Sequence, residues 1–182
     1  MNILEYRKLY KEKILHGDPL FPYITYLCSI PLDFGYVPMH WHDEMEIIYI
    51  KKGNGTITVD FTQHTVSAGD IALILPGQLH SIGQFESESM EYENIIFRLS
   101  MLMGDNGDGC TVHFLKPLQE GQAKNPVLIQ RNQPDHEVFG KVIQELDRFS
   151  EIRGNGYQLA VKGQLFCFVL CLWQRHLVYR EE

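Results

Sequence analysis

The sequence predicts a mainly β protein, a small sandwich or barrel followed by two helices. Between residues 46 and 99, short runs of apolar and β-branched residues recur between turns rich in glycine, proline and aspartate. After residue 134 the spacing of apolar residues changes to that of a helix. Short strands at regular intervals, with no helices between them, favour a sandwich or barrel over a βαβ fold.

The beginning of the chain predicts a helix and then extended segments. Residues 3–15 place apolar side chains at nearly helical spacing, and a turn at 16–19 ends the pattern. Residues 20–36 are rich in aromatic and aliphatic side chains but contain prolines, which suits edge strands. The chain therefore divides into an N-terminal helix or arm (1–19), a β-barrel (20–120), and a linker with two helices (121–182).

Within the barrel segment, turn residues suggest where the strands end. Two strand-like runs, 46–51 and 56–61, flank Lys52-Gly53-Asn54-Gly55, which predicts a hairpin with an Asn-Gly turn. A glycine-rich loop at 104–109 lacks the terminal glutamate of a calcium loop and the Lys-Ser/Thr of a phosphate loop, so we interpret it as a plain turn. Residues 110–118 are expected to be a last extended segment.

The tail predicts two helices and a homodimer. An apolar stripe at helical spacing extends from about residue 134 to residue 152, before a Gly-Asn-Gly turn. The second helix, about 157–179, is apolar nearly all round, so either the barrel or a second subunit must cover it. We favour a second subunit, with the dimer interface formed by Leu165, Val169, Leu170 and Trp173.

Composition narrows the function classes. The formal net charge of −7 makes this chain alone a poor candidate for binding nucleic acid. Four cysteines without a Cys-x-x-Cys pair indicate free, mostly buried thiols in a reducing compartment. The N-terminus lacks a signal peptide, and the longest apolar run, 165–173, is too short to span a bilayer. We therefore expect a cytoplasmic protein without a membrane partner.

One cluster of residues stands out chemically: His40, His42, Glu46 and His80. On a straight strand Glu46 would lie roughly 20 Å beyond His40, so the chain must bend at residues 43–44 if these groups converge. Three imidazoles and one carboxylate suit a divalent ion such as Zn, Ni, Fe or Mn. The same groups could instead hydrogen-bond a polar organic ligand.

Neighbouring residues add ligand contacts but no catalytic group. Trp41 and Tyr49 flank the cluster and could stack on a sugar or an aromatic ligand, although either could simply belong to the core. No nucleophile with a base and an acid partner is identifiable, so no catalytic residue is predicted. The remaining spaced histidines, interpreted as surface or capping residues, are His64, His113, His136 and His176.

Two motifs in this chain resemble those of the cupin superfamily, whose fold is a double-stranded, jelly-roll-like β-barrel. They are Gly35-x4-His40-x-His42-x3-Glu46-x6-Gly53 and Gly69-Asp70-x5-Pro76-Gly77-x2-His80. The amino-acid sequence around these motifs, together with the two helices predicted after them, resembles the N-terminal effector-binding and dimerisation domain of AraC-type transcriptional regulators. The resemblance covers about residues 20–180.

The resemblance implies a sensor. His40, His42, Glu46 and His80 match the cupin metal ligands, and in the regulators such positions often line the pocket for a sugar or another small effector. These regulators carry a C-terminal helix-turn-helix DNA-binding domain that this chain lacks, so the natural chain is expected to continue. Effector binding would reach DNA through that domain, by movement of the N-terminal segment or of the dimer helices. The alternative is a free-standing, metal-dependent cupin enzyme, such as an oxygenase, isomerase or decarboxylase.

Overall fold

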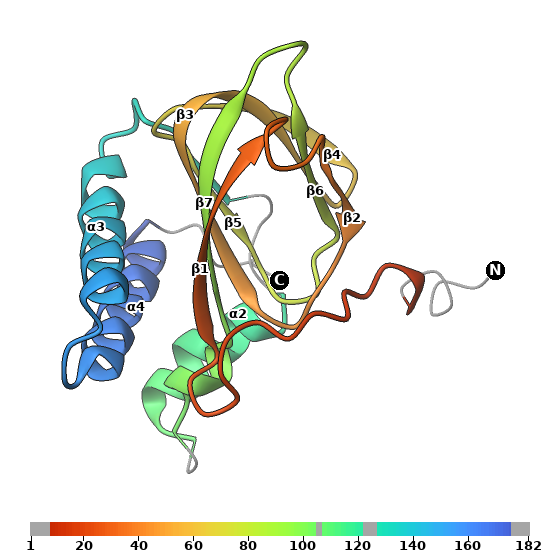
Figure 1. Cartoon of the computed structure of the whole chain (residues 1–182). Coiled ribbons are helices and arrows are strands. Elements are labelled where there is room, and N and C mark those ends of the chain that lie inside the picture. The colour runs from red at the N-terminus through yellow and green to blue at the C-terminus, as the bar shows by residue number, and fades with distance from the viewer. Residues whose placement is uncertain (1–7, 105–106, 122–126, 176–182) are drawn as a thin grey trace.

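The computed structural model describes residues 8–104, 107–121 and 127–175 and shows a β-barrel with helices packed against one side (Figure 1). Within these residues eight strands, all paired antiparallel, form two sheets that share one long strand, β3 (Met45–Val59). One sheet has the order β1-β7-β3-β5-β8, and in the other β3 pairs with β4 and β6 while β6 pairs with β2. The predicted mainly β, double-stranded barrel is therefore confirmed. The other strands are β1 (Tyr23–Ile30), β2 (Val37–His40), β4 (Thr62–Ser67), β5 (Ile71–Ile74), β6 (His80–Gln84), β7 (Met90–Phe97) and β8 (Val127–Ile129).

Strand β3 passes from one sheet to the other near its middle. As far as Gly53 it pairs with β5 and β7, and from Asn54 onward it pairs with β4 and β6. The register against β7 shifts between Ile50 and Lys52, where an irregularity bends the strand. One continuous strand therefore contributes to both walls of the barrel.

The predicted hairpin around Asn54-Gly55 is wrong, because the glycines there allow strands to approach closely. Gly53 has a φ of +72°, and a Cβ at this position would lie 1.9 Å from the carbonyl oxygen of Ser89. A Cβ on Gly55 would lie 2.4 Å from the sulfur of Met90. Pairing with β7 on one side of the bend and with β4 on the other keeps the chain extended through the Asn-Gly pair.

The chain reverses instead at Asp60 and Phe61, between β3 and β4. Both residues have positive φ, 45° and 69°, as a two-residue type I′ turn requires. The carboxylate of Asp60 accepts hydrogen bonds from the Gln78 side-chain amide at 3.0 Å and from the Leu79 backbone N–H at 3.3 Å. These contacts stabilise a turn that lacks glycine.

Alternate residues of the shared sheet face two separate apolar cores. Ile48 and Ile50 of β3 face the barrel interior together with Tyr92 of β7. Ile47 of β3 and Phe97 of β7 face the opposite way, toward the helices. The strands of this sheet are covered on both faces, which explains their nearly continuous apolar runs.

Two C-terminal helices, α3 (His136–Ile152) and α4 (Tyr157–Gln174), pack together beside the barrel (Figure 1). The prediction of two helices in the tail is therefore confirmed. The predicted extension of the second helix beyond residue 175 lies outside the described residues. Arg153 and Gly156, with φ of 44° and 79°, make the short connection between the helices. The stripe of α3 that contacts the core consists of Phe139, Val142, Ile143 and Leu146.

Two of the four residues predicted for a dimer interface are buried within the chain. Leu165 is fully buried and Val169 is 4% exposed, both in the core between the helices and the sheet. Leu170 is 55% exposed. Trp173 is partly buried and donates its indole N–H to the carbonyl oxygen of Phe114 at 3.2 Å. The prediction for Leu165 and Val169 is therefore wrong, because α3 and the sheet cover their side of α4.

The prediction of a helix over residues 3–15 is wrong for residues 10–15, which are not helical. Only residues 8 and 9 are helical, and residues 1–7 lie outside the described part. Lys11 forms a parallel bridge with Trp41, where the Glu12 N–H donates to the Trp41 carbonyl and the Trp41 N–H to the Tyr10 carbonyl, both at 2.9 Å. A short isolated helix is marginal in water, and these backbone bonds favour an extended arm.

Residues after β7 differ from the prediction in two further places. The segment expected to be extended, 110–118, is instead helical, and the short strand β8, which pairs with β5, was not predicted. Part of the loop at 104–109 lies outside the described residues. The short helical elements here are η1 (Leu99–Leu102), η2 (Thr111–Leu115) and α2 (Lys116–Gln119).

The cysteines are free, as predicted, but less buried than expected. Cys110 and Cys167 are exposed, and Cys28 and Cys171 are partly buried. Among the described helices, none combines the length and the apolar character needed to cross a membrane.

Candidate functional site

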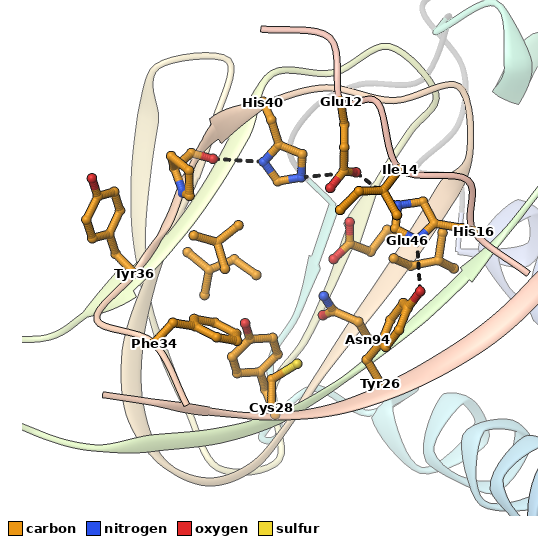
Figure 2. A pocket seen from close by; sticks show the side chains of 15 residues that line it. Glu12, Ile14, His16, Tyr26, Cys28, Phe34, Tyr36, His40, Glu46 and Asn94 are labelled. Carbon is orange, nitrogen blue, oxygen red and sulfur yellow. Dashed lines mark hydrogen bonds and ion pairs between the residues drawn. The ribbon is translucent and has the colours of Figure 1, made fainter. Parts of the chain in front are cut away.

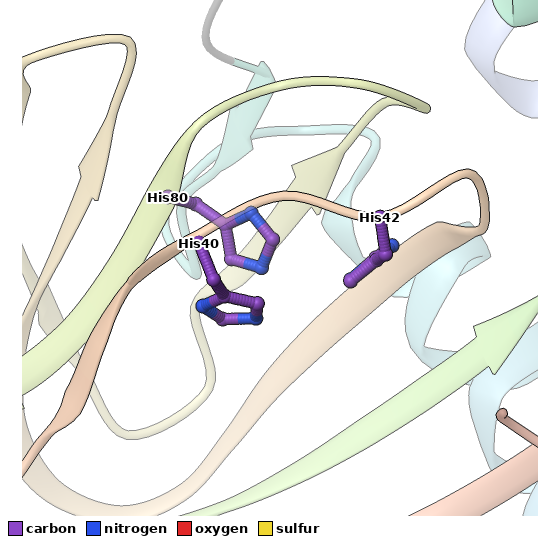
Figure 3. A group of neighbouring side chains, drawn as sticks. All are labelled: His40, His42 and His80. Atoms are coloured by element: carbon purple, nitrogen blue, oxygen red, sulfur yellow. The ribbon is translucent and has the colours of Figure 1, made fainter. Parts of the chain in front are cut away.

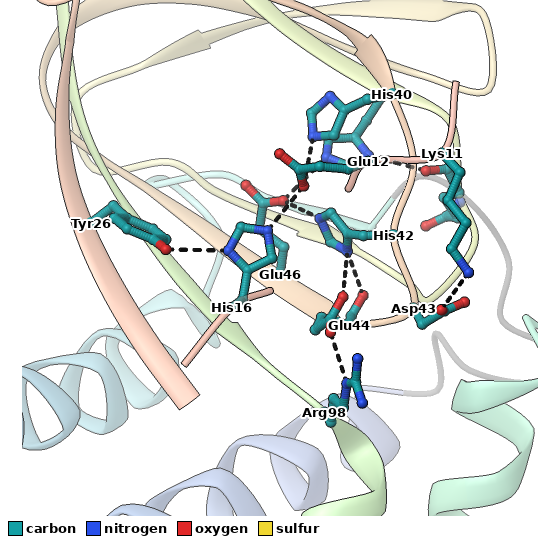
Figure 4. A network of polar contacts seen from close by, with 12 residues as sticks. Lys11, Glu12, His16, Tyr26, His40, His42, Asp43, Glu44, Glu46 and Arg98 are labelled. Atoms are coloured by element: carbon teal, nitrogen blue, oxygen red, sulfur yellow. Dashed lines mark hydrogen bonds and ion pairs between the residues drawn. The ribbon is translucent and has the colours of Figure 1, made fainter. Parts of the chain in front are cut away.

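The chain bends between β2 and β3, as the spacing of the histidines and Glu46 required. Asp43-Glu44 form the bend, and the carbonyl of His42 accepts the backbone N–H of Gly77 at 2.8 Å. The buried Glu44 carboxylate accepts a hydrogen bond from Nε of Arg98 at 2.8 Å (Figure 4). These contacts return the chain so that Glu46 lies beside His42 instead of far beyond it.

The bend brings His40, His42, Glu46 and His80 together at one end of the barrel interior, and Figure 3 shows the three imidazoles side by side. Oε2 of Glu46 lies 3.0 Å from Nε2 of His42 and 3.1 Å from Nε2 of His80. One nitrogen from each histidine lies within 4.8 Å of the others. The predicted convergence of the four side chains is present in the structure.

Backbone contacts fix the orientation of all three imidazoles. Nδ1 of His40 lies 2.8 Å from the Pro38 carbonyl, and Nδ1 of His80 lies 3.0 Å from the Gln78 carbonyl. Nδ1 of His42 lies 3.0 Å from the carbonyl of the second residue after it. A carbonyl oxygen can only accept, so each Nδ1 carries the proton and each Nε2 is left with its lone pair when the ring is neutral. Imidazoles held in this way are typical of metal ligands.

The same contacts set the charges in the cluster. Burial by itself would raise the pKa of Glu46, but the contacts with His42 and His80 outweigh burial and hold this pKa well below its usual range. Burial would lower the pKa of His42, and its hydrogen bond with Glu46 reverses that effect, so this pKa is raised. Burial and the neighbouring His80 lower the pKa of His40. The charged forms of Glu46 and His42 therefore favour each other.

The three imidazoles fit a divalent metal ion, and the carboxylate of Glu46 lies beside two of them. Nε2 of His80 is buried, and its neighbour is Oε2 of Glu46 at 3.1 Å. Three imidazole nitrogens and one carboxylate oxygen form a donor set that suits Zn, Ni, Fe or Mn.

A cavity of about 370 Å³ adjoins the cluster (Figure 2). In Figure 2 Glu12, His16 and Glu46 lie on one side of it and Phe34 and Tyr36 on the other. Both aromatic side chains are partly exposed to solvent, Phe34 at 38% and Tyr36 at 67%. The cavity is lined by Glu12, Ile14, His16, Tyr26, Cys28, Phe34, Tyr36, Val37, Pro38, His40, Glu46, Ile82, Tyr92, Asn94 and Ile96.

The N-terminal arm supplies one wall of this cavity (Figure 4). Nε2 of His16 lies 2.9 Å from Oε2 of Glu12, and its Nδ1 lies 3.3 Å from the hydroxyl of Tyr26. The hydrogen bond with Glu12 raises the pKa of His16. Oε2 of Glu12 also lies 3.9 Å from Nε2 of His40, so the arm contacts the histidine cluster directly.

Four of the six predicted ligand contacts lie outside the cavity lining. His42 and His80 contact Glu46 next to the cavity, whereas Tyr49 and Trp41 point elsewhere. Tyr49 packs with the core beneath the helices, and Nζ of Lys51 lies 5.0 Å from its ring centroid. It follows Glu46 by three residues, so the alternation of β3 turns it to the other face. Trp41 precedes His42 and likewise alternates, and Nζ of Lys11 lies 4.8 Å from its ring centroid. The prediction of Tyr49 and Trp41 as pocket residues is therefore wrong.

Sequence reasoning missed most of the lining. The arm residues Glu12 and His16 were expected on a helix and at its end, and no spacing connects them with the histidine motif. Tyr92 and Asn94 lie on β7, far along the sequence from the motif, at alternate positions of one strand. That alternation was the only available signal, and it does not say which face looks inward.

A double-stranded barrel with an internal cavity, a cluster of histidines and a carboxylate at one end, and two helices outside defines a cupin-type ligand-binding domain. The chain belongs to the family of AraC-like ligand binding domains, whose profile matches residues 21–165.

Individual relatives match only part of the chain. An uncharacterized HTH-type transcriptional regulator, YdeC of Bacillus subtilis, is 31% identical over 83 residues, which are 45% of this chain and 28% of that protein. Among solved structures, a predicted oxalate decarboxylase from Thermotoga maritima is 27% identical with a TM-score of 0.38, covering 41% of this chain and 65% of that one. A cupin protein from Bacteroides fragilis is 23% identical with a TM-score of 0.36, covering 44% of this chain and 70% of that one.

Proposed function

We propose that this chain senses a small-molecule effector as the ligand-binding part of an AraC-type transcription regulator. The observation that carries the proposal is the 370 Å³ cavity, which has ionisable groups from both the barrel and the N-terminal arm. Its volume lies in the range of small-molecule sites, where a few polar groups orient a ligand against apolar walls. A sugar is one candidate effector, since hydroxyl groups could hydrogen-bond to Glu12 and Asn94.

Two routes would carry the effect of binding away from the cavity. The arm is one, because Glu12 contacts His16 and His40, and a ligand there would change what holds the arm. Strand β7 is the other, because Asn94 faces the cavity while the adjacent Glu93 forms an ion pair with Lys51 beneath α3. For either route, the ligand would have to bind one conformation of the domain more tightly than another.

The same proposal includes a homodimer formed through α4, with a revised interface. Exposed apolar side chains on one face of this helix are Leu159 at 78%, Phe166 at 40% and Leu170 at 55%. Beside them an apolar groove of about 170 Å³ includes Phe114 and Trp173. A contiguous apolar surface of this kind is typical of an interface between subunits.

Control of transcription would need a DNA-binding domain in addition to this chain. The net charge of −7 supports a division of labour in which another domain binds DNA. The Bacillus subtilis relative is described as an HTH-type transcriptional regulator. A transcription regulator acts where the chromosome is, so we place this chain in the bacterial cytoplasm.

Thermal-shift screening with a metabolite library tests the sensor. An effector at a hundred times its dissociation constant should stabilise the chain by about 2.7 kcal/mol, which is a shift of several degrees. Glu46→Gln should reduce this shift, because it removes the charge at the polar end of the cavity. The matched control is His113→Ala, an exposed histidine outside the cavity lining, which should leave the shift unchanged. A library without any stabilising member would contradict the proposal.

A second candidate is a metal-dependent cupin enzyme. The observation that favours it is the set of three imidazoles whose Nδ1 atoms contact backbone carbonyls, beside the carboxylate of Glu46. When bound, a metal there would supply Lewis-acid or oxygen-activating chemistry. The chain's own residues would hold it through His40, His42, Glu46 and His80.

Elemental analysis of untagged protein separates the two candidates. Stoichiometric Fe or Mn that is lost in His42→Ala but retained in His113→Ala would favour the enzyme. Metal-free protein that is stabilised by a metabolite would favour the sensor. Zinc or nickel titration followed by calorimetry measures the affinity of the same site directly, independent of any activity.

A further inference from the structure

The distribution of polar and apolar side chains in the cavity narrows the class of effector. This inference rests on the proposed sensor function and concerns the same cavity. We propose that the effector is a small neutral amphiphile, a single ring or a compact branched aliphatic group that carries a hydroxyl, and not a sugar or an anion. Three features of the lining support this class.

Apolar side chains form most of the wall away from the histidine cluster. Phe34, Tyr36 and Val37 come from the chain around the start of β2, Ile82 from β6 and Ile96 from β7. Tyr36 is 67% exposed, so a ligand that covered it would remove apolar surface from water. A polyol could place some hydroxyls at Glu12 and Asn94, but it would bury the others against these apolar residues without hydrogen bonds, at a cost for each unpaired group. The wall therefore favours a ligand with an apolar body.

Two buried polar atoms in the lining are poorly satisfied. Oδ1 of Asn94 has no hydrogen-bond partner among the described residues, and the hydroxyl of the fully buried Tyr92 has the weak Cys28 thiol beside it. Burial raises the pKa of Tyr92, so its hydroxyl stays protonated and can donate. The amide oxygen of Asn94 can only accept. A ligand hydroxyl both donates and accepts, so it can satisfy either atom.

The charges of the lining disfavour an anion. Glu12 and Glu46 are the carboxylates of the lining, and each already contacts a histidine, His16 and His42 respectively. No lysine or arginine belongs to the described lining. An anionic head group would approach both carboxylates, and the lining imidazoles of His16 and His40 already lie beside Glu12, so its burial costs free energy. A neutral head group avoids this cost.

The volume limits the size. At about 30 Å³ for each water-sized group, a cavity of 370 Å³ holds roughly a dozen such groups. A single ring with one or two substituents fits that space. Two fused rings with substituents or a disaccharide would have to displace the arm at Ile14.

Calorimetry with four matched probes tests the class on the metal-stripped chain. Para-cresol has a ring and a hydroxyl, toluene lacks the hydroxyl, para-toluate replaces it with a carboxylate, and galactose lacks the apolar body. Para-cresol should bind more tightly than the other three. Tyr92→Phe or Asn94→Leu should weaken para-cresol binding about tenfold, because a buried polar partner is lost. The control Tyr157→Phe, at the start of α4 and outside the lining, should not weaken it.

The outcomes separate this inference from the sensor function. Tighter binding of galactose or para-toluate than of para-cresol would overturn the class and leave the sensor intact. Equal binding of toluene and para-cresol, with no effect of Tyr92→Phe, would overturn the role of the hydroxyl. No binding of any probe, together with a metabolite library that fails to stabilise the chain, would overturn both.

Discussion

Replacement of Glu93 by glutamine should remove a pH-dependent part of the stability of this protein. Glu93 lies on the face of β7 that looks toward α3 and is 7% exposed. Nζ of Lys51 lies 2.6 Å from its carboxylate and 2.9 Å from that of Asp147 on α3. Burial and the neighbouring carboxylate of Asp147 raise the pKa of Glu93 to about 7, against the opposing effect of Lys51.

The pKa of Glu93 sets the sign and size of the effect. Its ordinary value is 4.5 and the folded value is about 7. The difference, 7 minus 4.5, corresponds to about 3 kcal/mol at 1.36 kcal/mol for each pH unit. Below pH 4.5 the residue is protonated in both states and its contribution is fully present. As the pH rises to about 7, the unfolded chain releases the proton and the folded chain keeps it, so the free energy of unfolding falls.

Urea unfolding of wild type and Glu93→Gln at several pH values from about 4.5 to 8 measures this contribution. The free energy of unfolding of the variant, relative to wild type, should rise by about 3 kcal/mol across this range, since glutamine does not titrate. Any constant loss from the contact with Lys51 cancels in this comparison. Glu151→Gln, an exposed glutamate on α3 near the same ion pairs, is the matched control. A difference that stays flat to within about 0.5 kcal/mol would refute the reasoning.

Two further predictions concern the bend of β3 and the outer face of α4. Gly53→Ala should lower the free energy of unfolding by about 2–4 kcal/mol, because the positive φ and the approach to Ser89 leave no room for a Cβ. Gly140→Ala, in α3 with open space around the Cβ position, should raise it by about 0.5–1 kcal/mol, and equal effects of the two substitutions would contradict the argument. Leu170→Asp should convert a dimer to a monomer in sedimentation velocity, whereas Gln158→Asp on the same helix should not. A wild-type chain that sediments as a monomer would contradict the interface.

The convergence of His40, His42, Glu46 and His80 could be predicted because it depends on distances along one chain. His42 and Glu46 on a straight strand cannot meet, so the bend at Asp43-Glu44 followed from the length of a residue. The turn at Gly77 connects to that bend through the His42 carbonyl, and it places His80 beside Glu46. Local geometry and a motif sufficed here.

Other parts of the site could not be predicted, because they depend on which surfaces pair. The apolar residues of the arm, such as Ile14, fit a helix by spacing, yet the arm is held by backbone bonds to Trp41. Tyr49 alternates with Glu46, and only the position of the helices shows which face is the pocket. The apolar side chain of Leu165 on α4 is buried in the core of its own chain, so it is not available to contact a partner. Periodicity identifies an apolar face but not what covers it.

Residues 35–80, which carry the two motifs, illustrate this division between local and tertiary information. By itself the sequence determined the mainly β architecture, the two C-terminal helices, the bend, and the four residues that converge on it, since these follow from residue period, turn chemistry and chain length. Only the tertiary structure decided that β3 continues through Asn54-Gly55 and that Glu12 and His16 close the cavity. These features depend on contacts between segments far apart in the chain, whose free energies outweigh local preference.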